Sequence, residues 1–155
     1  MERIGVTMQT ETVDGVLEEI MPLLQKHYAE IAWKKDKIPL DPDYDAYRRL
    51  EKAKILRIFT ARSGGTLVGY AIWMVTNNPH YKSMRLARSD IFYVEPSRRG
   101  AMMGQRLIKY SESELKKDGV NVIGLHIKTT LNWQRLAEHW GYEHTDVNMH
   151  KWLGD

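Results

Sequence analysis

The sequence contains no cysteine, and this absence excludes disulfide bonds, cysteine-based zinc sites and thiol nucleophiles. No apolar run approaches the roughly 18 residues that a membrane-spanning helix requires. The N-terminal residues also lack the apolar core of a signal peptide. Repeats and low-complexity tracts are missing as well. These absences predict a cytoplasmic protein that does not associate with membranes.

The length and composition predict a single globular domain, residues 1–155. A chain of 155 residues falls within the usual size of one domain. Hydrophobic residues make up 43% and charged residues 28%, which are ordinary values for a globular protein. The net charge of +3 is only mildly basic and suits an anionic small molecule as well as a nucleic acid.

Apolar periodicity predicts an α/β fold of the α+β type, in the order β-α-α-β-β-β-α-β-α-β. The expected strands are residues 3–8, 55–61, 66–76, 87–94, 120–128 and 145–152. The expected helices are residues 13–31, 44–54, 101–117 and 131–140. We expect Thr12 and Asp41 to cap the first two helices. Pro22 is expected to kink or divide the first helix, because it lacks an N–H group.

Residues 91–108 form the most informative segment. A strand is expected to lead through a short basic turn directly into an amphipathic helix. The uncovered N–H groups at a helix start bind anions, and the nearby cations would favour a diphosphate; these cations are Arg98, Arg99, Arg106 and Lys109. The alternative from the residues alone is a turn with a solvated basic face.

This segment resembles the acetyl-CoA-binding motif of the GNAT (Gcn5-related N-acetyltransferase) superfamily, V-x-P-x-x-R-G-x-G-x-G-x-x-L. The matching residues are Val94, Pro96, Arg99, Gly100, Gly104 and Leu107. The expected element order resembles that family over nearly the whole chain. The resemblance implies a GNAT fold with a mixed sheet of about six to seven strands and about four helices. It also implies an N-acetyltransferase that moves acetyl from acetyl-CoA to a primary amine, by direct attack and without a metal.

The resemblance also implies which residues hold the acetyl donor. The backbone of Phe92, Tyr93 and Val94 would pair with pantetheine as an added strand does. The Val94 N–H would stabilise the oxyanion. The diphosphate would be held by the turn and the helix start: Arg99, Gly100, Ala101, Met102, Met103, Gly104 and Gln105. Met102 replaces the first glycine of the G-x-G part of the motif, and we expect it to have a right-handed helical φ.

Three residues are candidates for proton transfer, because an attacking amine must lose a proton. Asp90 lies four residues before Val94, and its alternative role is to cap a loop or pair with Arg88. His126 lies on the neighbouring strand and could instead be an ordinary core histidine. Tyr93 is a candidate acid or a half-buried strand residue. The tyrosine acid common in the family is replaced here by Ala137.

The acceptor is not encoded in a recognisable motif. His27 and Glu30 on the first helix, with His80 and Tyr81 in a loop, could contact a small-molecule or peptide amine. Their alternative roles are a surface pair and turn packing. No metal site is expected, and a homodimer is left open. A GNAT-fold CoA-binding or regulatory protein with little or no turnover is the alternative function, whereas the basic residues are too few to favour nucleic acid.

Overall fold

The computed structural model describes residues 5–100 and 102–154. The elements follow one another in this order: β1 (Val6–Glu11), α1 (Val13–Ile31), α2 (Tyr44–Lys52), β2 (Leu56–Ser63), β3 (Thr66–Asn78), β4 (Tyr81–Val94), the 3-10 turn η1 (Pro96–Arg98), α3 (Met103–Lys117), β5 (Val122–Gly124) and α4 (Gln134–His139). The α/β fold is confirmed, and the element order is confirmed through α4. No helix in these described ranges is both long and apolar enough to cross a membrane.

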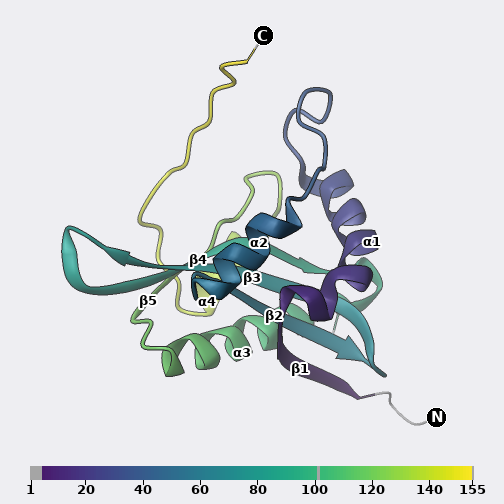
Figure 1. Cartoon of the computed structure of the whole chain (residues 1–155), viewed down its shortest axis with the longest axis horizontal. Helices are drawn as coiled ribbons and strands as arrows, with labels where there is room; N and C mark the ends of the chain where they lie inside the picture. Colours follow the sequence, from purple (N-terminus) through teal and green to yellow (C-terminus); the bar gives the residue numbers. More distant parts are fainter. Residues whose placement is uncertain (1–4, 101, 155) are drawn as a thin grey trace.

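One mixed sheet organises the molecule (Figure 1). Its strand order is β1-β2-β3-β4-β5. The first four strands are antiparallel neighbours, and β5 alone runs parallel to β4. Gly64 and Gly65, with φ of 57° and 85°, form the tight turn between β2 and β3. Such positive φ values suit the right-handed twist of the two strands, so the expected hairpin is confirmed.

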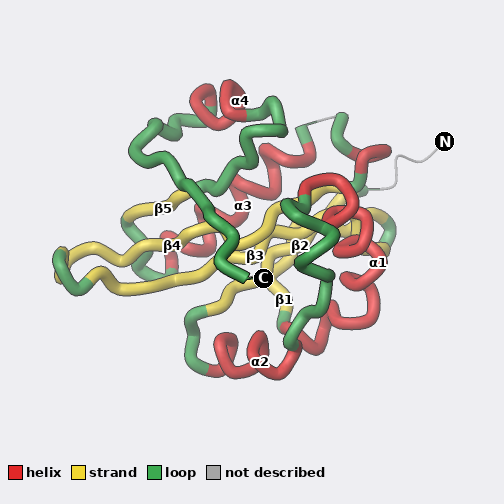
Figure 2. Tube along the Cα trace, turned by 90° about the horizontal axis from the view of Figure 1, so that it is seen from above, coloured by secondary structure: helices red, strands yellow, loops and turns green. Residues whose placement is uncertain are grey.

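Helices cover both faces of the sheet (Figure 2). Helices α1 and α2 lie on one face, and α3 and α4 lie on the other. The core is correspondingly split into two layers of buried side chains. The α1 layer includes Val16, Ile20, Ile58, Tyr70 and Tyr93. The α3 layer includes Phe59, Trp73, Val94, Leu107 and Ile108. Neighbouring residues of one strand therefore serve opposite layers, as the period of two requires.

The helix starts partly confirm and partly correct the sequence analysis. Thr12 caps α1, because its side chain accepts a hydrogen bond from Gly15 N at 3.1 Å. Asp41 was the wrong cap for α2, since Asp43 Oδ1 accepts from Ala46 N at 2.8 Å. Helix α1 is also not divided, and it continues as one element through Pro22. Pro22 is exposed, so water can reach the carbonyl that loses its partner.

The sheet has five strands instead of the expected six to seven. Residues 145–152, expected to be the last strand, run as an extended chain and pair with no strand of the described ranges. Residues 125–128 leave the ladder after Gly124. Alternating apolar and polar residues show that a segment can form a strand, whereas pairing also requires an available edge. The pattern alone therefore overcounted the strands.

Candidate functional site

A β-bulge in β4 places Asp90. Ile91 pairs with Ile72 and Ser89 pairs with Trp73, so Asp90 is an extra residue without a partner on β3. A bulge bends the strand and redirects the side chain of the extra residue. The Asp90 carboxylate is exposed to solvent at one side, and within the described ranges it forms no hydrogen bond or ion pair.

The protein around Asp90 changes its acidity. Limited hydration of the carboxylate raises its pKa, and the nearby His126 opposes this rise. Asp90 in turn adds to the raised pKa of Tyr47, which burial mainly causes. The expected alternative of an Asp90–Arg88 ion pair does not occur. Asp90 is therefore an unpaired carboxylate whose pKa is shifted toward neutrality.

Strands β4 and β5 separate just beyond their short ladder. Only Leu86–Arg88 of β4 pair with Val122–Gly124 of β5. Past this point, His126 N donates to Ser89 Oγ at 2.8 Å, so a side chain replaces the ladder. The remaining part of β4, from Asp90 to Val94, therefore has an open edge on the β5 side, where an extended group could add.

The register of β4 directs the Val94 N–H group toward this open edge. Glu95 N donates to Val68 O at 2.9 Å, so the next pair inward, Val94 with Gly69, is of the non-hydrogen-bonded type. Residues of such a pair point their N–H and C=O groups away from each other. The Val94 N–H accordingly faces the side on which β5 has diverged.

His126 approaches Asp90 from the residues that follow β5. Its ring is exposed, so it is not the ordinary core histidine considered as an alternative. Partial burial lowers its pKa, with a further contribution from Arg88, while Asp90 raises it. Asn148 Nδ2 lies 3.0 Å from His126 Nε2, where it can donate to the neutral ring. The lowered pKa and this contact both favour the neutral imidazole.

His27 belongs to a buried aromatic cluster rather than to a surface pair. Its Nδ1 forms a hydrogen bond of 2.8 Å with the Tyr70 hydroxyl, and its ring stacks on Tyr93 at 4.9 Å between centroids. Burial lowers the pKa of His27 to about 4. Tyr93 is 3% exposed, and its buried hydroxyl has no partner among the described residues. His27 thus remains neutral at physiological pH and supports Tyr93.

Arg99 connects the basic turn to α1. Its two terminal nitrogens donate to Glu30 at 2.7 and 2.6 Å, and its Nε donates to Val94 O at 2.9 Å. The guanidinium also lies 5.5 Å from the Tyr93 ring centroid. The hydrogen bond from Arg99 lowers the pKa of Glu30. Arg99 and Glu30 therefore fix the end of β4, which is a positioning role.

The start of α3 is uncapped, and an exposed arginine precedes it. Met102, the N-cap residue, provides no side-chain hydrogen bond to the first turn. The N–H groups of this turn are therefore available to an anion. Arg98 precedes the helix in η1 and is exposed. These features are compatible with a diphosphate. Ala101 lies outside the described residues.

Met102 corrects one expectation. Its φ of 56° and ψ of 26° are left-handed, not right-handed helical. The left-handed conformation favours glycine, because a Cβ atom crowds the backbone there. The motif has glycine at this position, and here an exposed methionine occupies it. The chain thus makes the turn that the motif requires, with a strained residue.

Not all the expected site residues come together. They form two groups. Asp90 lies near His126 at the diverging ends of β4 and β5. His27 and Tyr93 stack on each other, and Arg99 joins Tyr93 to Glu30 on α1. His80 and Tyr81 lie at the turn between β3 and β4, where the hairpin projects from the body (Figure 1). The residues that sequence reasoning missed are Ser89, Tyr70, Asn148 and Lys128. No motif marks them, because their importance depends on contacts between distant segments.

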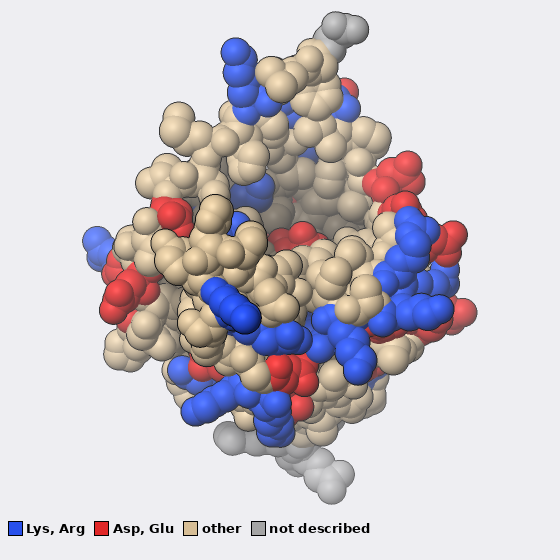
Figure 3. All heavy atoms as spheres, turned by 60° about the vertical axis from the view of Figure 1, so that its left-hand side comes forward, with Lys and Arg blue, Asp and Glu red and all other residues tan. Residues whose placement is uncertain are grey.

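Figure 3 shows a hollow in the surface of the molecule. Acidic atoms lie at its floor and basic atoms lie on its wall. Lys128 adds positive charge near both histidines, because it lowers the pKa of His27 and of His126. Within the described ranges, no group of three or more His, Cys, Asp or Glu side chains could hold a metal ion.

Comparison with known proteins identifies a family domain in most of the chain. A family model described as an acetyltransferase (GNAT) domain matches residues 54–144. This match includes β2 to α4 and therefore the bulge, the open edge and the basic turn. No curated protein sequence matches the chain at a significant level.

Solved structures share the fold at low sequence identity. A GCN5-related N-acetyltransferase from Ralstonia eutropha JMP134 is 20% identical with a TM-score of 0.79, covering 97% of this chain and 100% of that one. A protein from Clostridium acetobutylicum described as a predicted acetyltransferase, with acetyl-CoA, is 14% identical with a TM-score of 0.71, covering 96% and 97%. An aminoglycoside acetyltransferase from an uncultured soil metagenomic sample, in complex with sisomicin, is 14% identical with a TM-score of 0.73, covering 96% and 97%.

Proposed function

This chain belongs to the GNAT acetyltransferase family, and on that premise we propose that it transfers acetyl from acetyl-CoA to a primary amine. The acceptor attacks directly while both substrates are bound, since the chain has no cysteine to carry the acetyl group. One observation carries this proposal. An unpaired carboxylate at a bulge, Asp90, borders the same open edge toward which the Val94 N–H points.

Acetyl-CoA fits the residues at this edge. It supplies the thioester carbonyl carbon that the amine attacks. The open backbone from Phe92 to Val94 would pair with pantetheine, and the uncapped first turn of α3 with Arg98 would bind the diphosphate. Gly104 supports this arrangement, because a Cβ there would lie 3.4 Å from Phe92 and the turn packs closely on β4. The acetyl-CoA bound by the Clostridium acetobutylicum relative is consistent with this donor.

Asp90 acts as the general base in this proposal. A primary amine with a pKa near 10.4 is mostly protonated at neutral pH and must lose a proton. The raised pKa of Asp90 makes it a stronger base than an ordinary aspartate. His126, held neutral beside it, can pass the proton on toward the solvent.

The remaining proton and charge movements are assigned to Val94 and Tyr93. The Val94 N–H would stabilise the oxyanion, and Arg99 holds Val94 in place through its carbonyl oxygen. Tyr93 would protonate the departing thiolate in place of the family tyrosine that Ala137 replaces. Its burial raises its pKa, which keeps the hydroxyl protonated until the thiolate forms.

The acceptor is proposed to enter the hollow in Figure 3. The acidic floor would attract an amine, and the basic wall would accept an anionic group of the same molecule. A small-molecule amine is consistent with the sisomicin bound by the soil relative. A peptide amine is the other candidate acceptor. We also propose that the protein acts in the cytoplasm and that its reaction needs neither a metal nor a nucleic acid.

A coupled assay tests the proposed activity. The protein is incubated with acetyl-CoA and a panel of polyamines, aminoglycosides, amino acids and peptides, and free CoA is measured with a thiol reagent. Amine-dependent release of CoA by the native protein, strongly reduced in Asp90→Asn, is the expected result. If no amine of the panel causes release of CoA, and calorimetry detects no acetyl-CoA binding, the proposal is refuted.

The alternative is a CoA-binding regulatory protein with little turnover. Strained Met102 and the buried Ala137, 3% exposed, favour it, because both depart from the family motif at functional positions. Acetyl-CoA binding without any CoA release, in the same two assays, would identify this case.

A further inference from the structure

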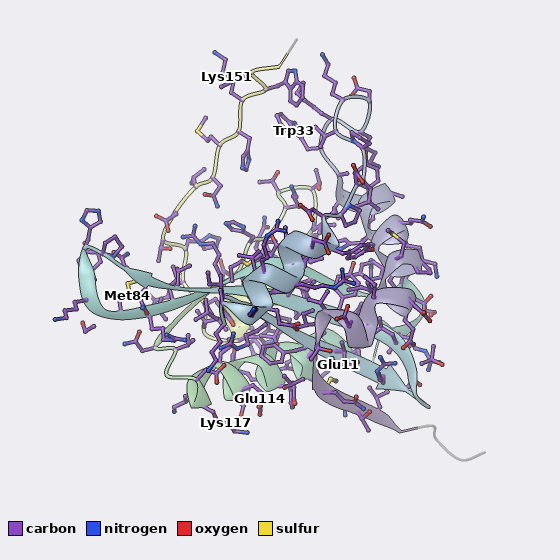
Figure 4. The ribbon with its side chains drawn as sticks, viewed as in Figure 1. Glu11, Trp33, Met84, Glu114, Lys117 and Lys151 are labelled. Carbon is purple, nitrogen blue, oxygen red and sulfur yellow. The ribbon has the colours of Figure 1, made fainter. Side chains whose placement is uncertain are left out.

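A pocket lies near the base of the hairpin that β3 and β4 form, and it is called the hairpin pocket below. Its volume of about 440 Å³ is within the range of about 300–1,000 Å³ that is usual for small-molecule sites. Figure 4 shows Met84 on the projecting part of this hairpin, well apart from Trp33 and Lys151. The residues that line the pocket come from the α2–β2 connection, the end of β3 and the start of β4, and they include Lys54, Ile55, Val75, Thr76 and Arg85.

Two cations line the hairpin pocket, and neither forms an ion pair within residues 5–100 and 102–154. Lys54 follows the end of α2, and Arg85 belongs to β4. Acids of the neighbouring elements are engaged elsewhere. Glu51 accepts a hydrogen bond from the first backbone N–H of α1 at 2.8 Å, and Asp118 pairs with Arg57 at 2.7 Å. The pocket therefore carries two positive charges without a counter-ion and attracts anions.

The Arg85 side chain also contains a donor without a partner. Arg85 Nε is buried and forms no hydrogen bond in the part of the chain that the structure describes. Such a donor destabilises a protein, so nearly all buried donors are paired. The backbone of Arg85 is fixed, because its N–H donates to Asn121 Oδ1 at 2.9 Å and its carbonyl oxygen accepts from Asn121 N at 3.1 Å. A small rotation of the side chain would bring Nε to an oxyanion in the pocket.

Lys54 has a backbone conformation that glycine usually adopts. Its φ is 57°, which is left-handed. Glycine is common at this place after a helix, because a Cβ atom crowds the left-handed backbone. The turn itself is required, since Ile55 N donates to Leu50 O at 2.9 Å and ends α2. A lysine here destabilises the turn, and a role for its ammonium group in the pocket explains its presence.

We propose that the hairpin pocket binds the phosphomonoester group of a small molecule. Such a group carries a charge of about −1.5 to −2 at pH 7, which matches Lys54 and Arg85. Arginine can donate two parallel hydrogen bonds to phosphate oxygens, whereas lysine supplies a compact charge. The Thr76 hydroxyl offers a further donor, and the apolar Ile55 and Val75 would contact the carbon skeleton. A carboxylate would leave one cation unpaired, and two cations are too few to hold a nucleic acid.

This site is separate from the proposed acetyl-CoA site. Arg85 lies nine residues before Val94 in β4, which is about 30 Å of extended chain. The two sites can therefore be occupied at the same time. Binding at the hairpin pocket requires no acetyl transfer, so its test is independent of the proposed activity.

Nuclear magnetic resonance and calorimetry of the full chain test the site with phenyl phosphate. The Arg85 Nε–H signal is identified by its loss in Arg85→Lys. Phenyl phosphate should shift this signal and bind with a Kd of about 1 mM or tighter. Inorganic phosphate lacks the carbon skeleton and phenol lacks the charge, so each should bind at least about tenfold more weakly. Saturating acetyl-CoA should leave the affinity for phenyl phosphate unchanged.

Substitutions test the two cations. Arg85→Gln and Lys54→Gly should each weaken phenyl phosphate binding by about 10- to 100-fold, which is the usual effect of removing one charged donor. Glycine suits the left-handed backbone, so Lys54→Gly removes the charge without disturbing the turn, and circular dichroism checks that each variant is folded. Lys82→Gln, at an exposed lysine of the same hairpin, is the matched control and should bind as the native protein does.

Four results would each overturn the proposal. They are an Arg85 Nε–H signal that phenyl phosphate does not shift, displacement of phenyl phosphate by acetyl-CoA, equal affinity for inorganic phosphate, and an equal loss of affinity in Lys82→Gln.

Discussion

At the scale of single residues, Asp90 combines an unpaired carboxylate with an unusual backbone position. Asp90→Asn keeps the size of the side chain but removes the base, and we expect kcat to fall by about 10²–10⁴-fold. The melting temperature should not fall, because no hydrogen bond or ion pair is lost and a poorly hydrated charge is removed. Steady-state rates and thermal unfolding measure the two effects. Asp36→Asn, at an exposed site in the α1–α2 connection, is the control; equal activity in both variants would remove Asp90 from the mechanism.

His27 predicts a dependence of stability on pH. Burial lowers the pKa of His27 from 6.5 to about 4. Between these pH values His27 is therefore protonated in the unfolded chain and neutral in the folded chain. The free energy of unfolding therefore falls as the pH falls from 6.5 toward 4, by about 3 kcal/mol from this residue. His27→Gln cannot bind that proton. Urea unfolding should show the advantage of the native protein over this variant shrinking by about that amount between pH 7.5 and 4, whereas a constant difference would contradict the assignment.

Met102 predicts a stabilising substitution. A left-handed residue with a Cβ costs roughly 1–2 kcal/mol, and glycine avoids this cost but loses about 0.5–1 kcal/mol of chain entropy. Met102→Gly should therefore raise the free energy of unfolding by about 0.5–1 kcal/mol. Met102→Ala keeps the Cβ and should give no gain, so it is the matched control. Chemical denaturation of the three proteins measures their free energies of unfolding. Equal gains in both variants would show that loss of the methionine side chain, and not relief of backbone strain, raises the stability.

At the scale of elements, a nearly buried ion pair joins β1, β2 and α1. Arg62, with its side chain 10% exposed, binds Glu11 at 2.7 Å and Glu19 at 2.8 Å. The hydrogen bond from Arg62 is the main reason that the pKa of Glu11 is lowered. Arg62→Met would leave Glu11 with only the Thr60 hydroxyl, and we expect a loss of about 3 kcal/mol in unfolding free energy.

The control for Arg62 is another arginine with two carboxylate partners. Arg48 pairs with Asp14 and Asp45, but its side chain is 41% exposed and those of its partners are more so. Arg48→Met should leave the unfolding free energy nearly unchanged, because water screens these charges. If the two substitutions cost the same, burial does not control the strength of these pairs.

Sequence reasoning succeeded where one local pattern decides an element. The apolar spacing of α1, the Thr12 cap and the paired glycines before β3 each have a local cause, and each was predicted. The bulge at Asp90 and the left-handed Met102 depend on how β4 meets its neighbours and how the turn enters α3. The missing last strand shows the same limit, because residues 145–152 alternate as a strand does while their pairing depends on an edge elsewhere.

At the scale of the whole molecule, the site lies where the sheet opens between two separately packed layers. Helix α1 reaches it from one face through Glu30 and Arg99, and α3 reaches it from the other face through its first turn. Each layer has its own buried cluster. A ligand held at the open edge would therefore contact both layers, and its binding should stabilise the entire domain and not one element alone.

Hydrogen exchange with acetyl-CoA measures this coupling. At a ligand concentration 100 times Kd, binding adds about 2.7 kcal/mol to the free energy of unfolding, so amides that exchange only by global unfolding should slow by about 100-fold in both layers. The Val94 amide and the first turn of α3 should gain additional protection, because they contact the ligand directly. The β3–β4 hairpin turn at His80 projects from the body and should exchange equally fast with and without ligand. Protection confined to the hairpin, or absent from α3, would place the acetyl donor elsewhere.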